Sequence, residues 1–403
     1  MKSRERVRRI LNHQVADRPA IDLGSSEVTS TSAWTYAALR EALGLPPKST
    51  RVFNLIQMLA EVDADVQDAL GADVAMLPPD EVILGGPYGD WKPATFPSGQ
   101  SFHVPKGFQP VAMPDGSLEV GISPGAEPTY RLPPDGRFFD VIPDKQGDPF
   151  DVPLLPRNEW RFVDDLGDDY LRAKEEVARN LYAQTDRAIM AQPPVFAPLG
   201  HGGLYNWAIV MMTEPAYAED YMMAQAEATA RCYEQYLQAV GDHIDVLIIS
   251  LADFGLQHRE LFRPALFEQF FVPAWEIVTE TVHRWPNVST WIHCCGSVPN
   301  LIGHFIEAGV DCLNPVQWTA DGMDLARLKQ AYGDRLVFWG GAISTQGTLP
   351  FGTPKEVAAE AECVLDTMTP EGGYVFNPIH NILPEVPIEN ILALFRTAQD
   401  YTT

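Results

Sequence analysis

A histidine and a cysteine are spaced for metal binding at the end of an apolar run. The segment WIHCCG occupies residues 291–296. Alternate side chains of a strand point to the same side, so His293 and Cys295 would face together while Cys294 faces away. An imidazole and a thiolate are ligands that suit Zn²⁺. A buried cysteine pair beside a hydrogen-bonded core histidine is the alternative interpretation.

Two other apolar runs end in candidate ligands. Residues 374–381 carry His380 near their end, and residues 246–255 carry Asp253. If the strands close into a barrel, both ends reach the same mouth as His293. We therefore predict a zinc site of His293, Cys295 and His380, with Asp253 as a fourth ligand or a catalytic group. Structural zinc normally has four protein ligands, so three strong ligands favour a catalytic site with an open position.

Other polar and aromatic side chains follow predicted strand ends. We assign Gln257 to catalysis and Gln317 to substrate binding, although hydrogen bonds to solvent or to loops explain both amides equally well. His201, which precedes two glycines, and the aromatic residues Tyr205 and Trp318 are further candidates for substrate binding. Aromatic residues at strand ends more often belong to the core, which is the competing interpretation.

The elements that would position these residues alternate between short apolar runs and longer helical patterns. The runs are residues 20–24, 73–78, 188–196, 246–255, 288–296, 312–317, 336–341 and 374–381. Helical patterns cover the amino terminus and residues 33–43, 64–70, 215–239, 264–284, 299–308, 324–332 and 354–367. Strand and helix in this rhythm indicate parallel strands with crossover helices. The number of repeats favours a closed (β/α)8 barrel over an open sheet.

One segment lacks the alternation of apolar runs and helical patterns. Residues 79–160 are rich in Pro, Gly and Asp and contain short β-like pieces such as SFHVP and TYRLPP. We expect residues 1–403 to form a single barrel domain, with residues 79–160 as a β-rich insertion or lid after an early strand. At the mouth of the barrel, such an insertion could cover the site or contact a partner.

Composition excludes several classes of function. The chain has 403 residues and carries 54 acidic against 29 basic side chains, for a formal charge of −25. This charge argues against nucleic-acid binding, because affinity for phosphate backbones comes from Lys and Arg. No apolar run approaches the roughly 20 residues of a membrane span. The 5 cysteines are too scattered for a secreted disulfide framework. A cytoplasmic protein is the prediction.

The chain resembles the uroporphyrinogen decarboxylase superfamily over nearly its whole length outside the insertion. The segments that carry the resemblance are RVRRILNH (6–13), GADV (71–74), ADFGLQ (252–257), HCCG (293–296), EAGVDCLNPVQ (307–317), WGGAIS (339–344), GTPKEV (352–357) and GGYVFNPIHNILPEVPIENI (372–391). The resemblance implies a (β/α)8 barrel, in agreement with the alternation of runs. It also implies one of two activities.

The first activity is decarboxylation of porphyrinogens. The resemblance implies an arginine-rich segment near the amino terminus that grips substrate carboxylates, yet residues 19–34 contain no arginine. Asp73 lies roughly where the decarboxylases keep a key aspartate, but a single Asp at a strand start is more often structural. Decarboxylation of a different, smaller carboxylic acid therefore remains the alternative.

The second activity is zinc-dependent methyl transfer to a corrinoid, and we favour it. The resemblance implies zinc held by His-x-Cys on one strand, matched by His293 and Cys295, and by a cysteine on the last strand, where this chain has His380. One thiolate and two imidazoles leave the site at +1, which favours demethylation of a neutral, methoxy-type small molecule. The corrinoid-binding signature Asp-x-His-x-x-Gly does not occur. The cobalamin would therefore be carried by a separate protein.

A structural zinc in a non-enzymatic binding protein is the third possibility. The sequence leaves open the identity of the methyl donor, the corrinoid partner and the oligomeric state.

Overall fold

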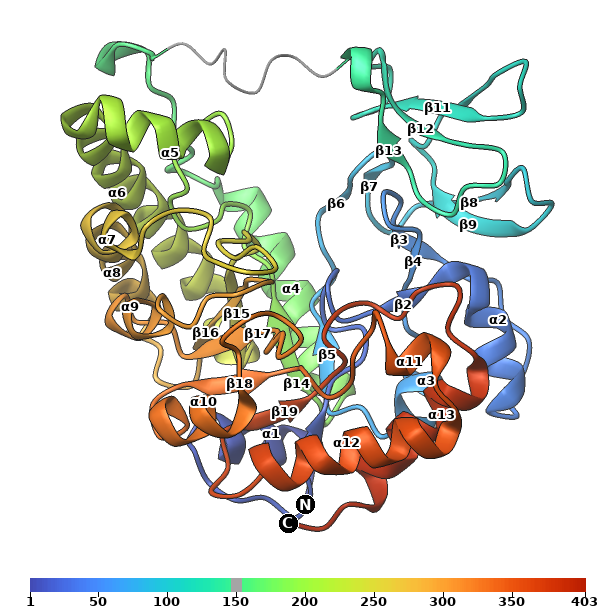
Figure 1. The fold of residues 1–403 in the computed structure, drawn as a ribbon. Coiled ribbons are helices and arrows are strands. Elements are labelled where there is room, and N and C mark those ends of the chain that lie inside the picture. The colour runs from blue at the N-terminus through green and yellow to red at the C-terminus, as the bar shows by residue number, and fades with distance from the viewer. Residues whose placement is uncertain (146–153) are drawn as a thin grey trace.

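Eight parallel strands form the centre of the computed structural model, which describes residues 1–145 and 154–403 (Figure 1). They are β1 (Ala20–Ile21), β5 (Val74–Met76), β14 (Ala188–Ala191), β15 (Val246–Ser250), β16 (Ser289–His293), β17 (Cys312–Asn314), β18 (Val337–Trp339) and β19 (Tyr374–Phe376). The sheet order is β1-β19-β18-β17-β16-β15-β14-β5. The backbone N–H of Asp73 donates to the carbonyl of Ile21 at 2.7 Å and so bridges the two edge strands. The predicted (β/α)8 barrel is confirmed, and each strand lies within a predicted apolar run.

Helices surround the strands. They are α1 (Ser3–Leu11), α2 (Ala33–Ala42), α3 (Ala64–Ala69), α4 (Asp168–Gln184), α5 (Leu204–Thr213), α6 (Pro215–Val240), α7 (Pro264–Leu266), α8 (Val272–Val282), α9 (Ile302–Glu307), α10 (Leu325–Tyr332), α11 (Thr348–Phe351), α12 (Pro354–Met368) and α13 (Ile388–Asp400). A π-helical turn, Phe267–Phe271, joins α7 to α8, and short 3-10 turns cover Pro143–Lys145, Arg157–Glu159 and Gly241–His243. Helices α4, α5, α11 and α13 were not among the predicted helical patterns. No helix in the described ranges combines the length and apolarity that a membrane span requires.

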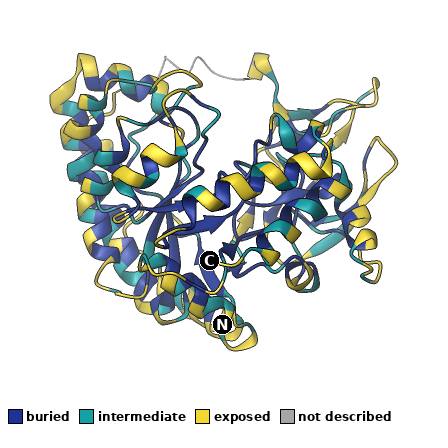
Figure 2. Cartoon of the chain, turned by 60° about the horizontal axis from the view of Figure 1, so that its bottom comes forward, coloured by how far each residue is buried: buried dark blue, intermediate teal, exposed yellow. Residues whose placement is uncertain are grey.

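Two apolar cores lie on the two faces of the strands. The strands themselves are buried, whereas the surrounding helices have exposed outer faces (Figure 2). The larger core lies between the strands and the helices. The smaller one fills the barrel and includes Met190, Ile248, Trp291 and Trp339. Because side chains alternate along a strand, seven of the eight strands contribute to both cores, and β5 contributes Val74 to the smaller one. The barrel interior is thus a packed core rather than a channel.

A buried ion-pair network closes the floor of the barrel at the amino ends of the strands. The Asp73 carboxylate, which is fully buried, accepts hydrogen bonds from Arg6 Nη1 at 2.7 Å and from Arg18 Nη1 at 2.8 Å. It also accepts the backbone N–H of Ile21 at 3.0 Å. Every acceptor position of a buried carboxylate needs such partners. Asp73 therefore stabilises the barrel floor and lies far from the carboxyl ends of the strands.

The expected β-rich insertion follows β5. It contains the antiparallel strands β6 (Glu81–Val82), β7 (Gly86–Pro87), β8 (Trp91–Thr95), β9 (Ser101–Pro105), β10 (Val111–Ala112), β11 (Leu118–Gly121), β12 (Pro128–Leu132) and β13 (Asp140–Val141). A further small sheet combines β2 (Thr31–Ser32), β3 (Val52–Asn54) and β4 (Leu59–Ala60). Trp34 of α2 packs edge-on against Phe96 and Phe102 of the insertion. Part of the predicted insertion, residues 146–153, lies outside the described residues.

Candidate metal centre

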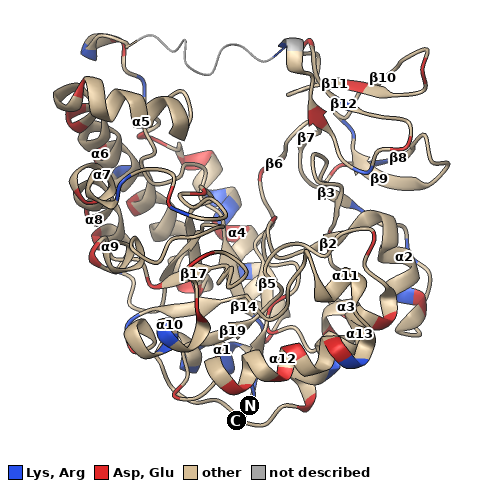
Figure 3. Ribbon diagram, viewed as in Figure 1, with Lys and Arg blue, Asp and Glu red and all other residues tan. Residues whose placement is uncertain are grey.

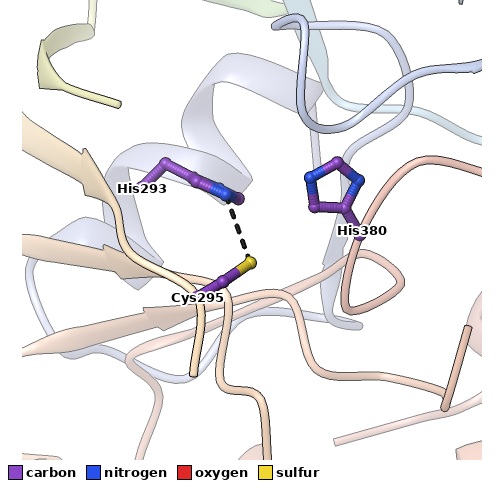
Figure 4. A group of neighbouring side chains, drawn as sticks. All are labelled: His293, Cys295 and His380. Carbon is purple, nitrogen blue, oxygen red and sulfur yellow. Dashed lines mark hydrogen bonds between the residues drawn. The ribbon is translucent and has the colours of Figure 1, made fainter. Parts of the chain in front are cut away.

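Three predicted ligands meet at the carboxyl ends of β16 and β19 (Figure 4). One ligand atom from each of His293, Cys295 and His380 lies within 4.8 Å of the other two. His293 Nε2 and Cys295 Sγ are 3.3 Å apart. The His293 and His380 rings have centroids 5.4 Å apart and are inclined by 80°. Barrel curvature brings the two strand ends together, although β17 and β18 separate them in the sheet.

Strand alternation determines which side chains of the WIHCCG segment reach the centre. Trp291 belongs to the core inside the barrel, and its ring lies 6.4 Å from that of His293. Ile292 and Cys294 belong to the outer core. Cys294 Sγ accepts the backbone N–H of Phe254 at 3.2 Å and is fully buried. The two cysteines therefore occupy different environments, and Cys295 is the one beside the histidines.

Two loops hold Cys295 in place. Asp253 Oδ1, after β15, accepts the backbone N–H of Cys295 at 2.7 Å and lies 3.8 Å from His293 Nε2. Gly296 has φ +90°, and a Cβ there would come within 2.6 Å of the carbonyl oxygen of Gly255. A side chain at position 296 would therefore force the loops apart. The glycine of the segment permits the close approach through which Asp253 orients Cys295.

Asn314 sets the tautomer of His293. Its Nδ2 donates to the carbonyl of Trp339 at 3.0 Å, so its Oδ1 faces His293 Nδ1 at 2.7 Å and must accept from it. With the proton on Nδ1, the Nε2 lone pair of His293 points toward Cys295. Such a partner on the second nitrogen is the usual support of a metal-binding histidine. Asn314 was not among the predicted site residues, although it is paired with His293 in the β16–β17 register.

Burial sets the protonation of the three groups. It lowers the pKa of His293 to about 4. Burial, followed by the neighbouring His293, lowers the pKa of His380 to about 4. Both imidazoles are therefore neutral at neutral pH, with lone pairs free to bind a metal. Burial raises the pKa of the Cys295 thiol, so binding of a metal would release its proton.

The donor set fits a zinc ion. In tetrahedral coordination, Zn–S and Zn–N bonds of about 2.3 and 2.0–2.1 Å place the sulfur and nitrogen donors roughly 3.5 Å apart. The observed separation of Cys295 Sγ and His293 Nε2 is 3.3 Å. Two neutral imidazoles and one thiolate form a donor set that binds Zn²⁺ in preference to Mg²⁺ or Ca²⁺.

A cavity of about 280 Å³ adjoins the cluster. Cys295 and His380 line it, together with the uncharged polar side chains Gln257, Gln317, Thr319, Ser344, Thr345 and Gln346. Gln257 Nε2 donates to the carbonyl of Thr319 at 2.7 Å, and Gln317 Oε1 accepts the N–H of Gly296 at 2.7 Å. These bonds orient both amides and leave Gln257 Oε1 and Gln317 Nε2 for a ligand.

The other predicted substrate residues lie outside the lining of this cavity. His201 packs among Trp207, Tyr217 and Tyr221, and its Nε2 lies 3.3 Å from the Tyr217 hydroxyl. Tyr205, on α5, is 60% exposed. Trp318 Nε1 donates to the Gly341 carbonyl at 2.7 Å. Their assignment to substrate binding remains a prediction.

Comparisons with known proteins agree with this architecture. The family model for uroporphyrinogen decarboxylase (URO-D) matches residues 199–401, about half of the chain. A uroporphyrinogen decarboxylase of Aromatoleum aromaticum is 23% identical over 275 residues, covering 64% of this chain and 72% of the relative. One of Coxiella burnetii is 23% identical over 312 residues, covering 70% and 82%. In structure, a methyltransferase from Methanosarcina mazei aligns over 99% of both chains with a TM-score of 0.57 and 17% identity. The chain belongs to the uroporphyrinogen decarboxylase family.

Proposed function

We propose that the protein is a zinc-dependent methyltransferase that moves a methyl group from a small, methoxy-type donor to a corrinoid. The convergence of His293, Cys295 and His380 on one point beside a cavity is the observation that carries the proposal. The fold shared with a methyltransferase is compatible with it. Three ligands leave a position open, as catalytic zinc sites do.

The protein's own residues would orient the zinc ligands and hold the methyl donor in the cavity. Asn314 keeps the Nε2 lone pair of His293 available, and Asp253 orients Cys295 through its backbone N–H. Gln257 and Gln317 would hold the donor in the cavity through their free amide groups. When bound, Zn²⁺ would supply a Lewis acid, whose formal charge with one thiolate and two imidazoles is +1.

The corrinoid would be carried by a separate protein that docks over the mouth of the barrel, and both proteins would meet in the cytoplasm, where we place this chain. We further propose one domain over residues 1–403, in which residues 79–160 act as a lid or a docking surface. Neither a membrane nor a nucleic acid enters this proposal.

Decarboxylation of a carboxylic acid is the second candidate, because the curated relatives are named for it. The cavity weighs against it. None of its lining residues is a lysine or an arginine, whereas carboxylate substrates are usually held by such cations.

Metal content and methyl transfer together test the proposal. Purified protein should hold about one zinc per chain, and the His293→Ala, Cys295→Ala and His380→Ala variants should lose it. Methylation of Co(I) cobalamin, followed by its visible spectrum across a panel of methoxylated donors, should require the zinc. A zinc-free wild-type protein that releases CO₂ from a carboxylic acid would support the alternative instead.

A further inference from the structure

A second, smaller cavity lies at the other half of the barrel mouth. It has a volume of about 70 Å³ and is lined by residues of β3, β5, β14 and β15 and of the segments that follow β1, β5 and β14. Its wall includes Glu27, Phe53, Asn54, Met190, Gln192 and Ile248. The zinc ligands, by contrast, follow β16 and β19.

The charged side chains that line this cavity are both carboxylates, Glu27 and the exposed Glu81. Glu27 is partly buried. Asn54 Nδ2 donates to Glu27 Oε2 at 2.7 Å. Asn54 Oδ1 in turn accepts the backbone N–H of Gln57 at 2.9 Å, which fixes the amide. No other side chain in the described residues hydrogen-bonds to this carboxylate, and none forms an ion pair with it. One carboxylate oxygen, Oε1, is thus left for a ligand.

Leaving a buried carboxylate without a cation is costly. Burial raises the pKa of Glu27, and the Asn54 hydrogen bond only partly offsets this effect. Buried charges in proteins are usually paired. The fully buried Asp73 and Asp245 each contact arginines. The fully buried Asp22 has no cation, but Ser25 and Trp339 donate hydrogen bonds to it. Figure 3 shows that acidic and basic residues are spread over the outer helices. Solvent screens charges at the surface. Glu27 differs from these three carboxylates because it lines a cavity and one of its oxygens has no hydrogen-bond partner among the described residues.

The remaining wall is suited to alkyl groups. Phe53, Met190 and Ile248 present an aromatic ring, a thioether and an aliphatic chain. An aromatic face attracts a cation, and a thioether is polarisable. At ~10–15 Å³ per water-sized atom, the volume holds about five non-hydrogen atoms. That is the size of a methylated ammonium group with one attached carbon.

We infer that the Glu27 cavity binds the methylated ammonium group of a small cationic molecule. The cavity is coupled to the zinc ligands by the chain itself, because Asn381, which follows His380, donates to the Glu27 carbonyl at 2.9 Å. The inference rests on the proposed methyl transfer only in that the ammonium group would be part of the methoxy-type donor, whose methoxy group itself stays neutral. Binding by itself requires neither zinc nor a corrinoid.

Calorimetric titration with choline and with its neutral isostere, 3,3-dimethylbutan-1-ol, tests the inference. The two probes have the same shape and differ in charge. Wild-type protein should bind choline at least about tenfold more tightly, which corresponds to roughly 1.4 kcal/mol. Glu27→Gln keeps the shape of the side chain and should reduce this preference to less than about threefold. Equal affinity of the wild type for the two probes, or no binding of either, would overturn the inference.

The control is Glu176→Gln, which removes the same charge from an exposed position of α4. It should keep the choline preference, so its loss would show a general effect of net charge and would refute a role for the cavity. If Glu27→Gln does not fold, the wild-type comparison of the two probes still decides. Zinc content and cobalamin methylation, measured separately, report on the proposed function. A protein that transfers methyl groups yet does not discriminate the probes would refute only the cavity.

Discussion

Replacing Asn314 by leucine should weaken zinc binding without removing a ligand. In the wild type, Asn314 Oδ1 accepts from His293 Nδ1 at 2.7 Å, which keeps the Nε2 lone pair free. Leucine has a similar size but cannot accept that proton. His293 can then place its proton on Nε2 instead, and in that tautomer it does not bind a metal there. Loss of such a supporting partner typically costs 10–100-fold in metal affinity, or about 1.4–2.7 kcal/mol.

The metal-free protein should also be destabilised. The substitution leaves two buried polar groups without partners, His293 Nδ1 and the Trp339 carbonyl that Asn314 Nδ2 now contacts at 3.0 Å. Each such group costs about 1–3 kcal/mol. Asn314→Asp separates the two effects. Aspartate still accepts the His293 Nδ1 proton, so Asn314→Asp should bind zinc better than Asn314→Leu. Its carboxylate lies against the Trp339 carbonyl, to which it cannot donate, so the loss of stability should remain.

Competition against a chromophoric zinc chelator gives the dissociation constants, and urea unfolding of the metal-free proteins gives their stability. Cys294→Ala is the matched control, because Cys294 adjoins both ligands in sequence but its side chain lies in the outer core. Its zinc affinity should stay within about threefold of the wild type. A folded Asn314→Leu protein with wild-type zinc affinity would refute the tautomer argument. Loss of zinc from Cys294→Ala would refute the assignment of Cys295 as the ligand.

Three further outcomes are expected. His380→Cys should retain zinc, lower the formal charge of the site from +1 to 0 and slow demethylation at least about tenfold, and an unchanged rate in the zinc-loaded variant would argue against a Lewis-acid role. Asp73→Ala should lower the free energy of unfolding by about 3–5 kcal/mol, because it removes the carboxylate that pairs with Arg18 and one of the two that pair with Arg6. A loss well below this range in chemical denaturation would contradict the structural role of Asp73. The hydrogen bond to Asp311 raises the pKa of His283, so this pair stabilises the fold below the unfolded pKa of about 6.5 and loses its effect as pH rises through the folded pKa. His283→Gln should therefore lower Tm more at about pH 5.5 than at about pH 8.5, and an equal loss at both would contradict the assignment.

The barrel could be predicted from the sequence because parallel strands that are buried on both faces consist of consecutive apolar residues. Each of the eight strands lies within such a run. The helix α4 escaped prediction because only Lys174 and Ala178 of its residues are buried, so its apolar periodicity is weak. Helix α5 begins after paired glycines and carries exposed apolar residues such as Tyr205, which obscures the usual pattern.

At the site, alternation within one strand was enough to pair His293 with Cys295, since that relation is local. The closure of the barrel decided that His380 joins them within 4.8 Å, because only the curvature of the sheet brings the ends of β16 and β19 together. The roles of Asn314 and Glu27 also depend on the packing of segments that are distant in sequence. One acts through a hydrogen bond across two neighbouring strands, and the other lacks a counter-ion in a cavity lined by residues of several strands. Sequence determines which residue types stand at the ends of strands, whereas distances, tautomers and the pairing of charges arise only when distant segments pack together.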